Sequence, residues 1–379
     1  MLQGCILVAN RAIVKTNIVQ PSVPVAIWAA HPTFVFSVSM ARTSIFWFRR
    51  DLRLSDNAGL YHALRSGVPV QPIFIFDRQI LDTLPNRQDM RVQFIHDALT
   101  QLQQQLAAMG ATLHVLYDTP ANAFARLADA YDLEAVYTNE DYEPYARSRD
   151  AAIAEWLKGR GIMFHAYKDQ VIFNPTEVLK DNGTPYTVYT PYSRKWKEHL
   201  TDFYLKAYPT EKYYSHLRQA AALPLPTMED IGFLPAPFKA PPLMPDEALV
   251  RHYNETRDYP AVDGTTRLGV HLRFGTVSVR RMATMARELN PVFLSELIWR
   301  EFFMSILWHY PHVEKGSFKK EYDGIAWRNN EKEFESWCKG QTGYPIVDAG
   351  MRELNATGYM HNRVRMIVAS FLTKDLLID

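Results

Sequence analysis

A carboxylate and a large aromatic ring stand three residues apart in the stretch SELIWREFF, residues 295–303. Helical spacing places four side chains of this stretch on one face: Glu296, Trp299, Arg300 and Phe303. A carboxylate beside an indole can hydrogen-bond and stack a flat heterocycle. An aromatic core helix with a surface ion pair gives the same pattern and is commoner, so this stretch alone leaves both interpretations open.

The sequence ends on TGYMHNRVRMIVASFLTKDLLID, residues 357–379, which is typical of a helix with two unlike faces. At about 100° per residue, one face is an apolar stripe of Val364, Ile367, Val368, Phe371 and Leu372. The other face carries small and polar side chains, namely Asn362, Arg365, Met366, Ala369 and Thr373. A buried polar side chain needs partners, because leaving it unpaired costs roughly 1–3 kcal/mol. The second face is therefore either the wall of a cavity that holds a polar ligand or a stripe that faces solvent.

A third candidate is the segment DGTTRLGVHLRFG, residues 263–275. Thr265, Thr266 and Arg267 offer hydroxyls, backbone N–H groups and a guanidinium, which are donors suited to a pyrophosphate. Gly264 permits a close approach, and Tyr253 adds a phenolic hydroxyl twelve residues before Thr265. An N-cap followed by a helix gives the same pattern. The segment is therefore a weak signal by itself.

The elements that must position these residues begin with five short apolar or aromatic runs, which predict buried strands. They are SIFWF (44–48), VPVQPIFIFD (68–77), TLHVLYD (112–118), EAVYTN (134–139) and MFHAYK (163–168). Helical stretches separate them, among them residues 92–110 and 151–161, and each of these two ends on a glycine. Strands joined by helical crossovers predict a doubly wound parallel sheet of the α/β, Rossmann-like class.

Such a sheet binds ligands at the carboxyl ends of its strands. Those ends carry RRDLR (49–53), Asp77 and NEDYEP (139–144). The sequence has neither a G-x-G-x-x-G fingerprint nor a P-loop, so it supports no dinucleotide or nucleoside triphosphate site of those kinds. An ion-paired loop is at least as good an interpretation of RRDLR as a ligand contact.

The pattern changes after the last strand. Eight prolines fall between Pro209 and Pro245, which predicts a long connector with one amphipathic helix near 189–200. From Asp246 the strand signals vanish, and the helical stretches are 245–256, 278–290, 291–310 and the terminal segment. We therefore expect an α/β domain over 41–170, a connector over 171–245 and an all-helical domain over 246–379.

Bulk composition excludes several classes of protein. The chain of 379 residues is 47% hydrophobic and can bury a sizeable core, and its net charge of +1 gives no sign of a nucleic acid or membrane partner. Any affinity for DNA must come from a local basic patch. The two cysteines, Cys5 and Cys338, are too few for a disulfide scaffold, and no Cys/His spacing fits a zinc site. A reducing, cytoplasmic compartment and the absence of a bound metal are therefore expected.

The first forty residues stand apart. No acidic residue precedes Asp51, and residues 23–40 are largely apolar but too few to span a membrane. A signal or transit peptide is one interpretation. We favour Met40 as the functional start, with residues 1–40 as an unstructured or miscalled extension.

In combination these stretches resemble the DNA photolyase and cryptochrome family, from Thr43 to Asp379. The matching segments are IFWFRRDLRLSDN, RDYPAVDGTTRLGVHLRFG, LSELIWREFF, TGYPIVDAGMRELNATGYMHNRVRM and ASFLTKDLLID, in the family's order. The resemblance implies an α/β antenna domain, a connector and a helical domain that holds FAD. It also implies light-driven splitting of cyclobutane pyrimidine dimers in UV-damaged DNA, with the dimer flipped out of the duplex and excited reduced flavin as the electron donor.

The resemblance implies a role for each matching position. The implied FAD contacts are Tyr253, Thr265, Thr266, Arg267, Leu268, Gly269, Asn362 and Arg365, with Asn362 near flavin N5. Glu296 would hydrogen-bond the dimer and Trp299 would stack on it, while Arg300, Arg363 and Met366 would lie near the lesion or the DNA. Trp327 matches the surface member of a tryptophan chain that reduces the flavin. The pairing of Glu296 with Asn362 resembles a dimer photolyase more than an animal-type cryptochrome.

The sequence departs from the family pattern in two respects. Tyr145 and Ala146 stand where some members contact a folate antenna, so a second chromophore, if bound, is unidentified. The family also continues past LLID with a segment that holds the flavin and the inner tryptophans. We therefore expect this chain to be truncated at its C-terminus and to bind FAD poorly.

Three functions are compatible with these residues. The first is dimer repair by a monomer that binds UV-damaged DNA and no membrane, and the second is a cryptochrome-like blue-light receptor without repair activity. The third is a remnant that folds only as the α/β domain and binds a nucleotide. Repair of a dimer-containing oligonucleotide separates the first two, and limited proteolysis that leaves only the stretch before Pro209 would indicate the third.

Overall fold

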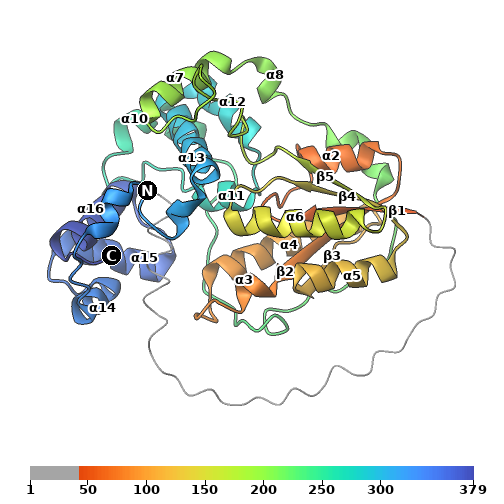
Figure 1. Cartoon of the computed structure of the whole chain (residues 1–379), viewed down its shortest axis with the longest axis horizontal. Helices are drawn as coiled ribbons and strands as arrows, with labels where there is room; N and C mark the ends of the chain where they lie inside the picture. The colour runs from red at the N-terminus through yellow and green to blue at the C-terminus, as the bar shows by residue number, and fades with distance from the viewer. Residues whose placement is uncertain (1–41) are drawn as a thin grey trace.

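The computed structural model describes residues 42–379, so the expected extension, Met40 and Cys5 lie outside the described part. Five parallel strands form one sheet in the order β3-β2-β1-β4-β5 (Figure 1). Their bounds are β1 Thr43–Phe48, β2 Val70–Asp77, β3 His114–Asp118, β4 Leu133–Asn139 and β5 Met163–Tyr167. All five strands occur where the sequence predicts them, and the doubly wound α/β class is confirmed.

The sheet is buried on both faces, which explains why its strands read as nearly continuous apolar runs. One face is covered by α2 (Ala58–Arg65) and α4 (Met90–Ala108), the other by α5 (Pro120–Ala130) and α6 (Pro144–Lys158). Along β1, Phe46 and Phe48 pack in the first of these layers, whereas Ile45 and Trp47 pack in the second. This alternation follows from the two-residue repeat of a strand.

Helix α6 is longer than the sequence predicts. The expected helix spans 151–161, but α6 begins at Pro144 and ends at Lys158. Pro144 occupies the first turn, where the missing N–H of proline costs nothing. The polar run that follows it hides the helical periodicity, so the helix starts at the last residue of NEDYEP, which the sequence analysis placed only at the carboxyl end of a strand.

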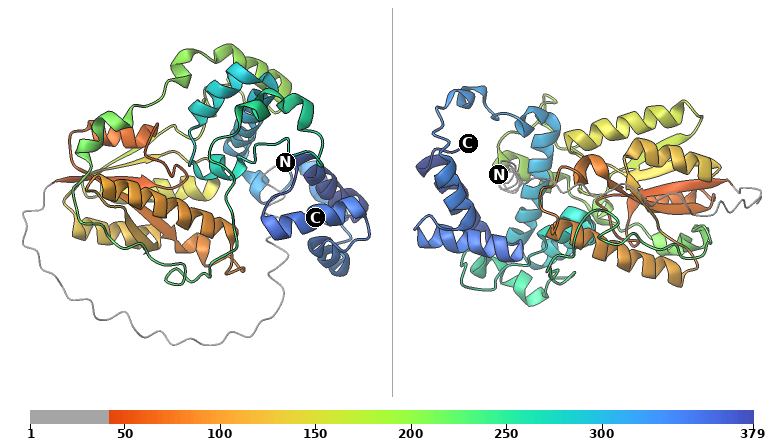
Figure 2. Two further views of the ribbon diagram at one scale, coloured as in Figure 1. Left: turned by 180° about the vertical axis from the view of Figure 1, so that it is seen from behind. Right: turned by 90° about the horizontal axis from the view of Figure 1, so that it is seen from below.

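The connector packs first against the helical half and then against the sheet domain. It contains α7 (Tyr189–His199), α8 (Asp202–Leu205) and η2 (Thr210–His216), and the predicted amphipathic helix corresponds to α7. The proline-rich part then runs back along the first face of the sheet, where Leu217, Met228, Ile231 and Phe233 join its core. Figure 2 shows this proline-rich segment lying along the α/β domain.

Helices alone follow in the described residues from 246 onward, as predicted. Their bounds are α9 Glu247–Arg251, α10 Tyr253–Thr256, α11 Gly269–Phe274, α12 Val279–Leu289, α13 Pro291–His309, η3 Pro311–Glu314, η4 Lys320–Gly324, α14 Glu331–Lys339, α15 Pro345–Thr357, α16 Asn362–Ser370 and η5 Phe371–Asp375. The predicted helix 245–256 is divided at His252, which ends α9 and precedes α10. Within residues 42–379, no helix has both the length and the apolar character that a bilayer crossing requires.

Glu301 on α13 is a buried anchor for the start of the connector. Its carboxylate accepts the backbone N–H of Ile172 at 2.8 Å and of Phe173 at 3.0 Å, and the indole N–H of Trp196 on α7 at 2.6 Å. The residue is 3% exposed. Burial raises the pKa of Glu301 to about 7, although the three donors favour the charged form.

We expect the stability that Glu301 confers to fall as pH rises. The folded pKa of about 7 lies above the ordinary 4.5, so the contribution is full below about pH 4.5 and is lost as pH rises through 7. The difference corresponds to about 3 kcal/mol. Urea unfolding at about pH 5 and about pH 8 should show the free-energy advantage of the wild type over Glu301→Gln shrinking at the higher pH. An advantage independent of pH would contradict the assignment.

Candidate functional site

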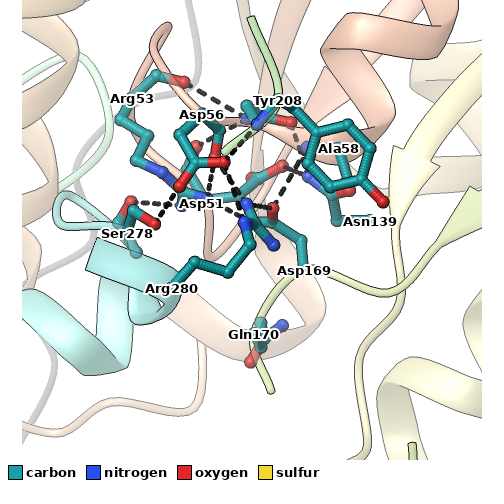
Figure 3. Close-up of polar contacts among 12 residues, drawn as sticks. Asp51, Arg53, Asp56, Ala58, Asn139, Asp169, Gln170, Tyr208, Ser278 and Arg280 are labelled. Atoms are coloured by element: carbon teal, nitrogen blue, oxygen red, sulfur yellow. Dashed lines mark hydrogen bonds and ion pairs between the residues drawn. The ribbon is translucent and has the colours of Figure 1, made fainter. Parts of the chain in front are cut away.

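A buried ionic network joins the loop after β1 to the start of α12 (Figure 3). Asp169, just after β5, accepts one guanidinium N–H from Arg53 and one from Arg280, each at 2.7 Å. Arg280 also donates to Asp56 at 2.8 Å, and the hydroxyl of Ser278, the N-cap of α12, donates to the other oxygen of Asp56. All five residues are at least nine-tenths buried. Two carboxylates and two guanidiniums thus balance in the space between the sheet and the helical half.

The other two arginines of the RRDLR motif are also ion-paired. Arg50 pairs with Asp141 at 3.0 Å, and Arg49 pairs with Asp150. Burial alone would raise the pKa of Asp141, but Arg50 and Arg49 outweigh it and lower the pKa to about 2. The ion-paired interpretation of this motif is therefore confirmed.

Helix α11 is fixed to the same loop through its backbone. The N–H of Leu52 donates to the carbonyl of Phe274 at 3.0 Å, and Arg53 donates to the carbonyl of Gly275 at 2.9 Å. Gly275 has φ +62°, and a Cβ there would lie 2.2 Å from the carbonyl oxygen of Arg50. Only glycine permits this approach. The α/β domain thereby sets the position of α11 and of residues 265–269 before it.

The candidate phosphate segment lies at the start of α11. Thr265 shares a hydrogen bond of 2.8 Å with the hydroxyl of Tyr359, and the Arg267 guanidinium lies 4.8 Å from the Tyr359 ring centroid. Arg267 has φ +51°, a left-handed conformation that a non-glycine residue rarely adopts. Leu268 is buried in the core, so it can offer a ligand only its backbone.

These residues fit the pyrophosphate of FAD. The backbone N–H groups of residues 265–269 donate to no other residue within the described part of the chain. A Cβ on Gly269 would meet no atom within 4 Å, so space is open beside these donors. Unpaired N–H groups, two threonine hydroxyls and a guanidinium form a donor set suited to phosphate.

Tyr253, the other side chain expected beside the flavin, lies on α10. Its ring meets Phe293 edge-to-face with centroids 5.2 Å apart. Burial, reinforced by Glu296, raises the pKa of Tyr253 to about 12. The phenol is therefore protonated at neutral pH and can donate a hydrogen bond.

Glu296 is linked to α16 by a short chain of ion pairs. Its carboxylate pairs with Arg257, and both side chains are about three-quarters buried, with 28% and 21% exposed. The neighbouring Asp258 pairs with Arg363 of α16 at 2.7 Å. Arg257 and Asp258 also contact each other at 3.3 Å. Two of the sequence-predicted lesion residues, Glu296 and Arg363, are thus brought to either side of one dipeptide.

Trp299 and Arg300 have different surroundings although they are adjacent. The indole of Trp299 stacks on Tyr189 of α7. The guanidinium of Arg300 donates to the carbonyls of Gln170 at 2.6 Å and Leu272 at 3.0 Å, and burial lowers the pKa of Arg300 to about 10. We assign Arg300 to the packing of α13 against α11 and the segment just after β5, because a desolvated guanidinium bound to two carbonyls is not presented to DNA.

Helix α16 presents its polar face openly. Asn362 is exposed, and its Nδ2 lies 4.0 Å from the sulfur of Met366, which is 52% exposed. Arg365 is half-buried and donates to the carbonyl of Met360 at 3.2 Å. The carboxamide of Asn362 makes no shorter hydrogen bond among residues 42–379, so it can hydrogen-bond a ligand.

The apolar face of α16 differs from the prediction at one position. Val364, Val368, Phe371 and Leu372 are buried as expected, but Ile367 is 40% exposed. Helix α15 packs along Val364 and Val368, where a Cβ on Gly350 would lie 2.4 Å from Val364 Cγ1. Ile367 falls beside this contact line and is not covered by it.

Trp327 lies between η4 and α14 and is half-buried. Its neighbour Arg328 donates a backbone N–H to the carbonyl of Leu377 at 2.8 Å, which ties this segment to the last described residues. Across residues 42–379, the indole of Trp327 makes no ring contact with another aromatic side chain. Its expected role in electron transfer stays a prediction.

Sequence reasoning missed three residues of this region, namely Tyr189, Arg257 and Glu301. Arg257 begins the matching segment RDYPAVDG, and Tyr189 begins the predicted amphipathic helix, so both were visible only as parts of a pattern. Arg257 pairs with Glu296, which lies 39 residues further along the chain. Tyr189 stacks on Trp299, which lies on a different helix. Contacts over such separations leave no local periodicity in the sequence.

Comparison with known proteins gives consistent results over most of the chain. The family models that match describe the DNA photolyase domain over residues 44–212 and the FAD binding domain of DNA photolyase over residues 293–379. A deoxyribodipyrimidine photo-lyase of Synechococcus sp. is 37% identical over 371 residues, which cover 90% of this chain and 76% of that protein.

Two solved structures are similar in fold as well as in sequence. A bacterial class III photolyase from Agrobacterium tumefaciens aligns with a TM-score of 0.77 and 30% identity, covering 92% of this chain and 76% of the other. An archaeal photolyase from Sulfolobus tokodaii, solved with two FAD molecules, aligns with a TM-score of 0.72 and 33% identity, covering 89% and 76%.

We expect the variant Asp169→Ala to lower the free energy of unfolding by about 3–5 kcal/mol, because it leaves Arg53 and Arg280 buried without their shared carboxylate. The matched control is Asp181→Ala, whose carboxylate is 98% exposed and pairs with Lys195 at 3.5 Å. It should change stability by about 0.5 kcal/mol or less. Urea unfolding measures both, and equal effects of the two variants would refute the buried role of Asp169.

Proposed function

The chain belongs to the DNA photolyase family, and we propose that it repairs cyclobutane pyrimidine dimers in UV-damaged DNA under blue light. The observation that carries the proposal is the set of side chains around residues 257–258. There the Glu296 carboxylate on α13 and the Arg363 guanidinium on α16 are joined through one dipeptide. Glu296 stands three residues before Trp299 on the same helix. These side chains form a frame that can hold a flipped-out pyrimidine dimer.

We assign the cofactor to the residues around α10, α11 and α16. FAD, when bound and reduced, supplies the light-excited electron donor. The backbone donors of residues 265–269 and the hydroxyls of Thr265 and Thr266 would hold its pyrophosphate, with Tyr253 as a further donor. The exposed carboxamide of Asn362 and the guanidinium of Arg365 would orient the ring system. The chain's own contribution is to bind and align.

We assign the lesion to the open side of α13. Glu296 would accept hydrogen bonds from the bases of the dimer, which requires it to loosen its contact with Arg257. Trp299 would stack on the dimer, and Met366, which is exposed beside Asn362, would offer an apolar contact. Arg363 would approach the DNA backbone, because guanidiniums bind phosphate well.

Further parts of the proposal concern electron supply and context. Trp327 would pass electrons from the surface, and a second light-harvesting chromophore, if present, is not identified by its residues. We propose a monomer in the cytoplasm that acts on UV-damaged DNA. The cryptochrome-like receptor is the second candidate, but the Synechococcus relative bears the name deoxyribodipyrimidine photo-lyase. The remnant hypothesis is not supported, because the described residues after 246 form a series of helices from α9 to η5.

Repair is the decisive measurement. The flavin-loaded chain should restore a duplex that contains one cyclobutane thymine dimer under blue light and not in the dark. Glu296→Gln should slow repair about 10- to 100-fold at equal flavin content, since a charged hydrogen bond is worth roughly 1.5–3 kcal/mol. Glu288→Gln, on exposed α12 surface, is the control and should not slow it. Loaded wild type that leaves the dimer intact would refute repair, whereas an unimpaired Glu296→Gln would refute only the role of Glu296.

A local basic cluster should carry part of the affinity for DNA. Lys315, Lys319 and Lys320 are all exposed. The double variant Lys315→Ala, Lys320→Ala should reduce the slope of log affinity against log salt by about 1–2, because each phosphate contact releases close to one counterion. Fluorescence anisotropy across a salt series measures the slope. The double variant Lys158→Ala, Lys212→Ala, exposed elsewhere, should leave it unchanged, and an identical loss in both would show that net charge alone is responsible.

A further inference from the structure

Tyr189 and Trp299 form an unusually close ring pair. Their centroids are 3.5 Å apart and the ring planes differ by 6°. The hydroxyl of Tyr189 donates to the backbone carbonyl of Ser295 at 2.9 Å, one turn before Trp299 on the same helix. The tyrosine side chain is thus fixed both by stacking on Trp299 and by the hydrogen bond of its hydroxyl.

The support behind this pair is rigid. Tyr192, one turn along α7, packs on Phe302 with centroids 5.2 Å apart, and Trp196, one turn further, donates to buried Glu301 at 2.6 Å. Three successive turns of α7 therefore contact α13. Because the helix is fixed at these points, Tyr189 cannot move away from Trp299 without disturbing buried contacts.

The orientation of Trp299 depends on ring packing alone. Its indole N–H donates to no residue among those described, and its other ring contacts are Phe302 at 5.8 Å and Phe303 at 5.6 Å. The residue is half-buried, so part of the indole is open to solvent. Tyr189 is the nearest ring and the one most nearly parallel to the indole.

We propose that Tyr189 is a positioning residue for lesion recognition, which fixes the plane of Trp299 and covers one indole face. A flipped-out base can then stack only on the part of the indole that Tyr189, Phe302 and Phe303 leave open to solvent. The inference rests on the proposed function, since it takes Trp299 to meet the damaged base. Pre-ordering the indole removes an entropic cost that binding would otherwise carry.

The test compares affinities in the dark for two duplex oligonucleotides of one sequence, with and without a single cyclobutane thymine dimer. Tyr189→Leu removes the stacked ring, and we expect it to lower the ratio of damaged to undamaged affinity about 3- to 10-fold, the range of one aromatic pair. Tyr189→Phe keeps the ring and loses only the hydroxyl bond, so it should keep most of the ratio.

The matched control is Tyr204→Leu. Tyr204 is also half-buried and belongs to the same core cluster. Its replacement removes a comparable aromatic pair, with Phe173 at 4.6 Å between centroids, that lies outside the Trp299 stack. Thermal melting of all variants measures the loss of stability. We expect Tyr204→Leu to be destabilised like Tyr189→Leu while its affinity ratio stays at the wild-type value.

The outcomes separate this inference from the proposed function. A wild type with no preference for the damaged duplex would overturn both. A wild type that prefers it, together with a Tyr189→Leu that keeps the full ratio, would overturn only the role of Tyr189. Equal loss of the ratio in Tyr189→Leu and Tyr204→Leu would show a general effect of stability and would also overturn it. Retention of the ratio in Tyr189→Phe supports stacking as the cause.

Discussion

Asp169 is almost completely buried, and each of its two oxygens accepts a hydrogen bond from a different guanidinium, Arg53 or Arg280. One of these oxygens also accepts the N–H of Ala58 at the start of α2. A carboxylate in this position ties together three parts of the chain that are distant in sequence: the loop after β1, the end of β5 and the first turn of α12. This contact therefore joins the sheet directly to the helical half.

A buried ionic junction of this kind serves geometry more clearly than stability. Desolvating the charges costs several kcal/mol per ion, and their attraction repays this only when nearly every lone pair and N–H is matched. Here the match is almost complete, with Nε of Arg53 as an exception. An apolar contact of equal area would let the sheet and α12 slide against each other. The ionic junction does not, because a small displacement leaves a charge unpaired. Helix α11 and the donors before it therefore inherit a fixed position, which a phosphate-binding segment needs.

The sequence was sufficient for the sheet and for most of the helices, because burial on one or two faces imposes a period that short segments display. It failed where polar residues determine the structure. The start of α6 at Pro144 was hidden by a polar run, and Glu301 was read as part of an aromatic helix because its three donors lie far away in the chain. Candidate residues such as Glu296 and Asn362 were found through family motifs. Their supports were not found: Arg257, which pairs with Glu296, and Tyr189, which stacks on Trp299.

The arrangement around Glu296 suggests how selectivity for a damaged base can arise. In the described state the carboxylate is already paired with Arg257, so accepting hydrogen bonds from a lesion exchanges one charged contact for others. Stacking on Trp299 exchanges no charged contact, because the part of the half-buried indole that Tyr189, Phe302 and Phe303 leave open faces solvent. The hydrogen bonds would then set orientation and reject bases that cannot donate, while the indole supplies net attraction. Undamaged bases must also be unstacked and unpaired before they reach this site, and that cost is smallest for a dimer that is already poorly paired. A rigid indole plane converts this difference into discrimination, because it cannot adjust to a base that enters at another angle.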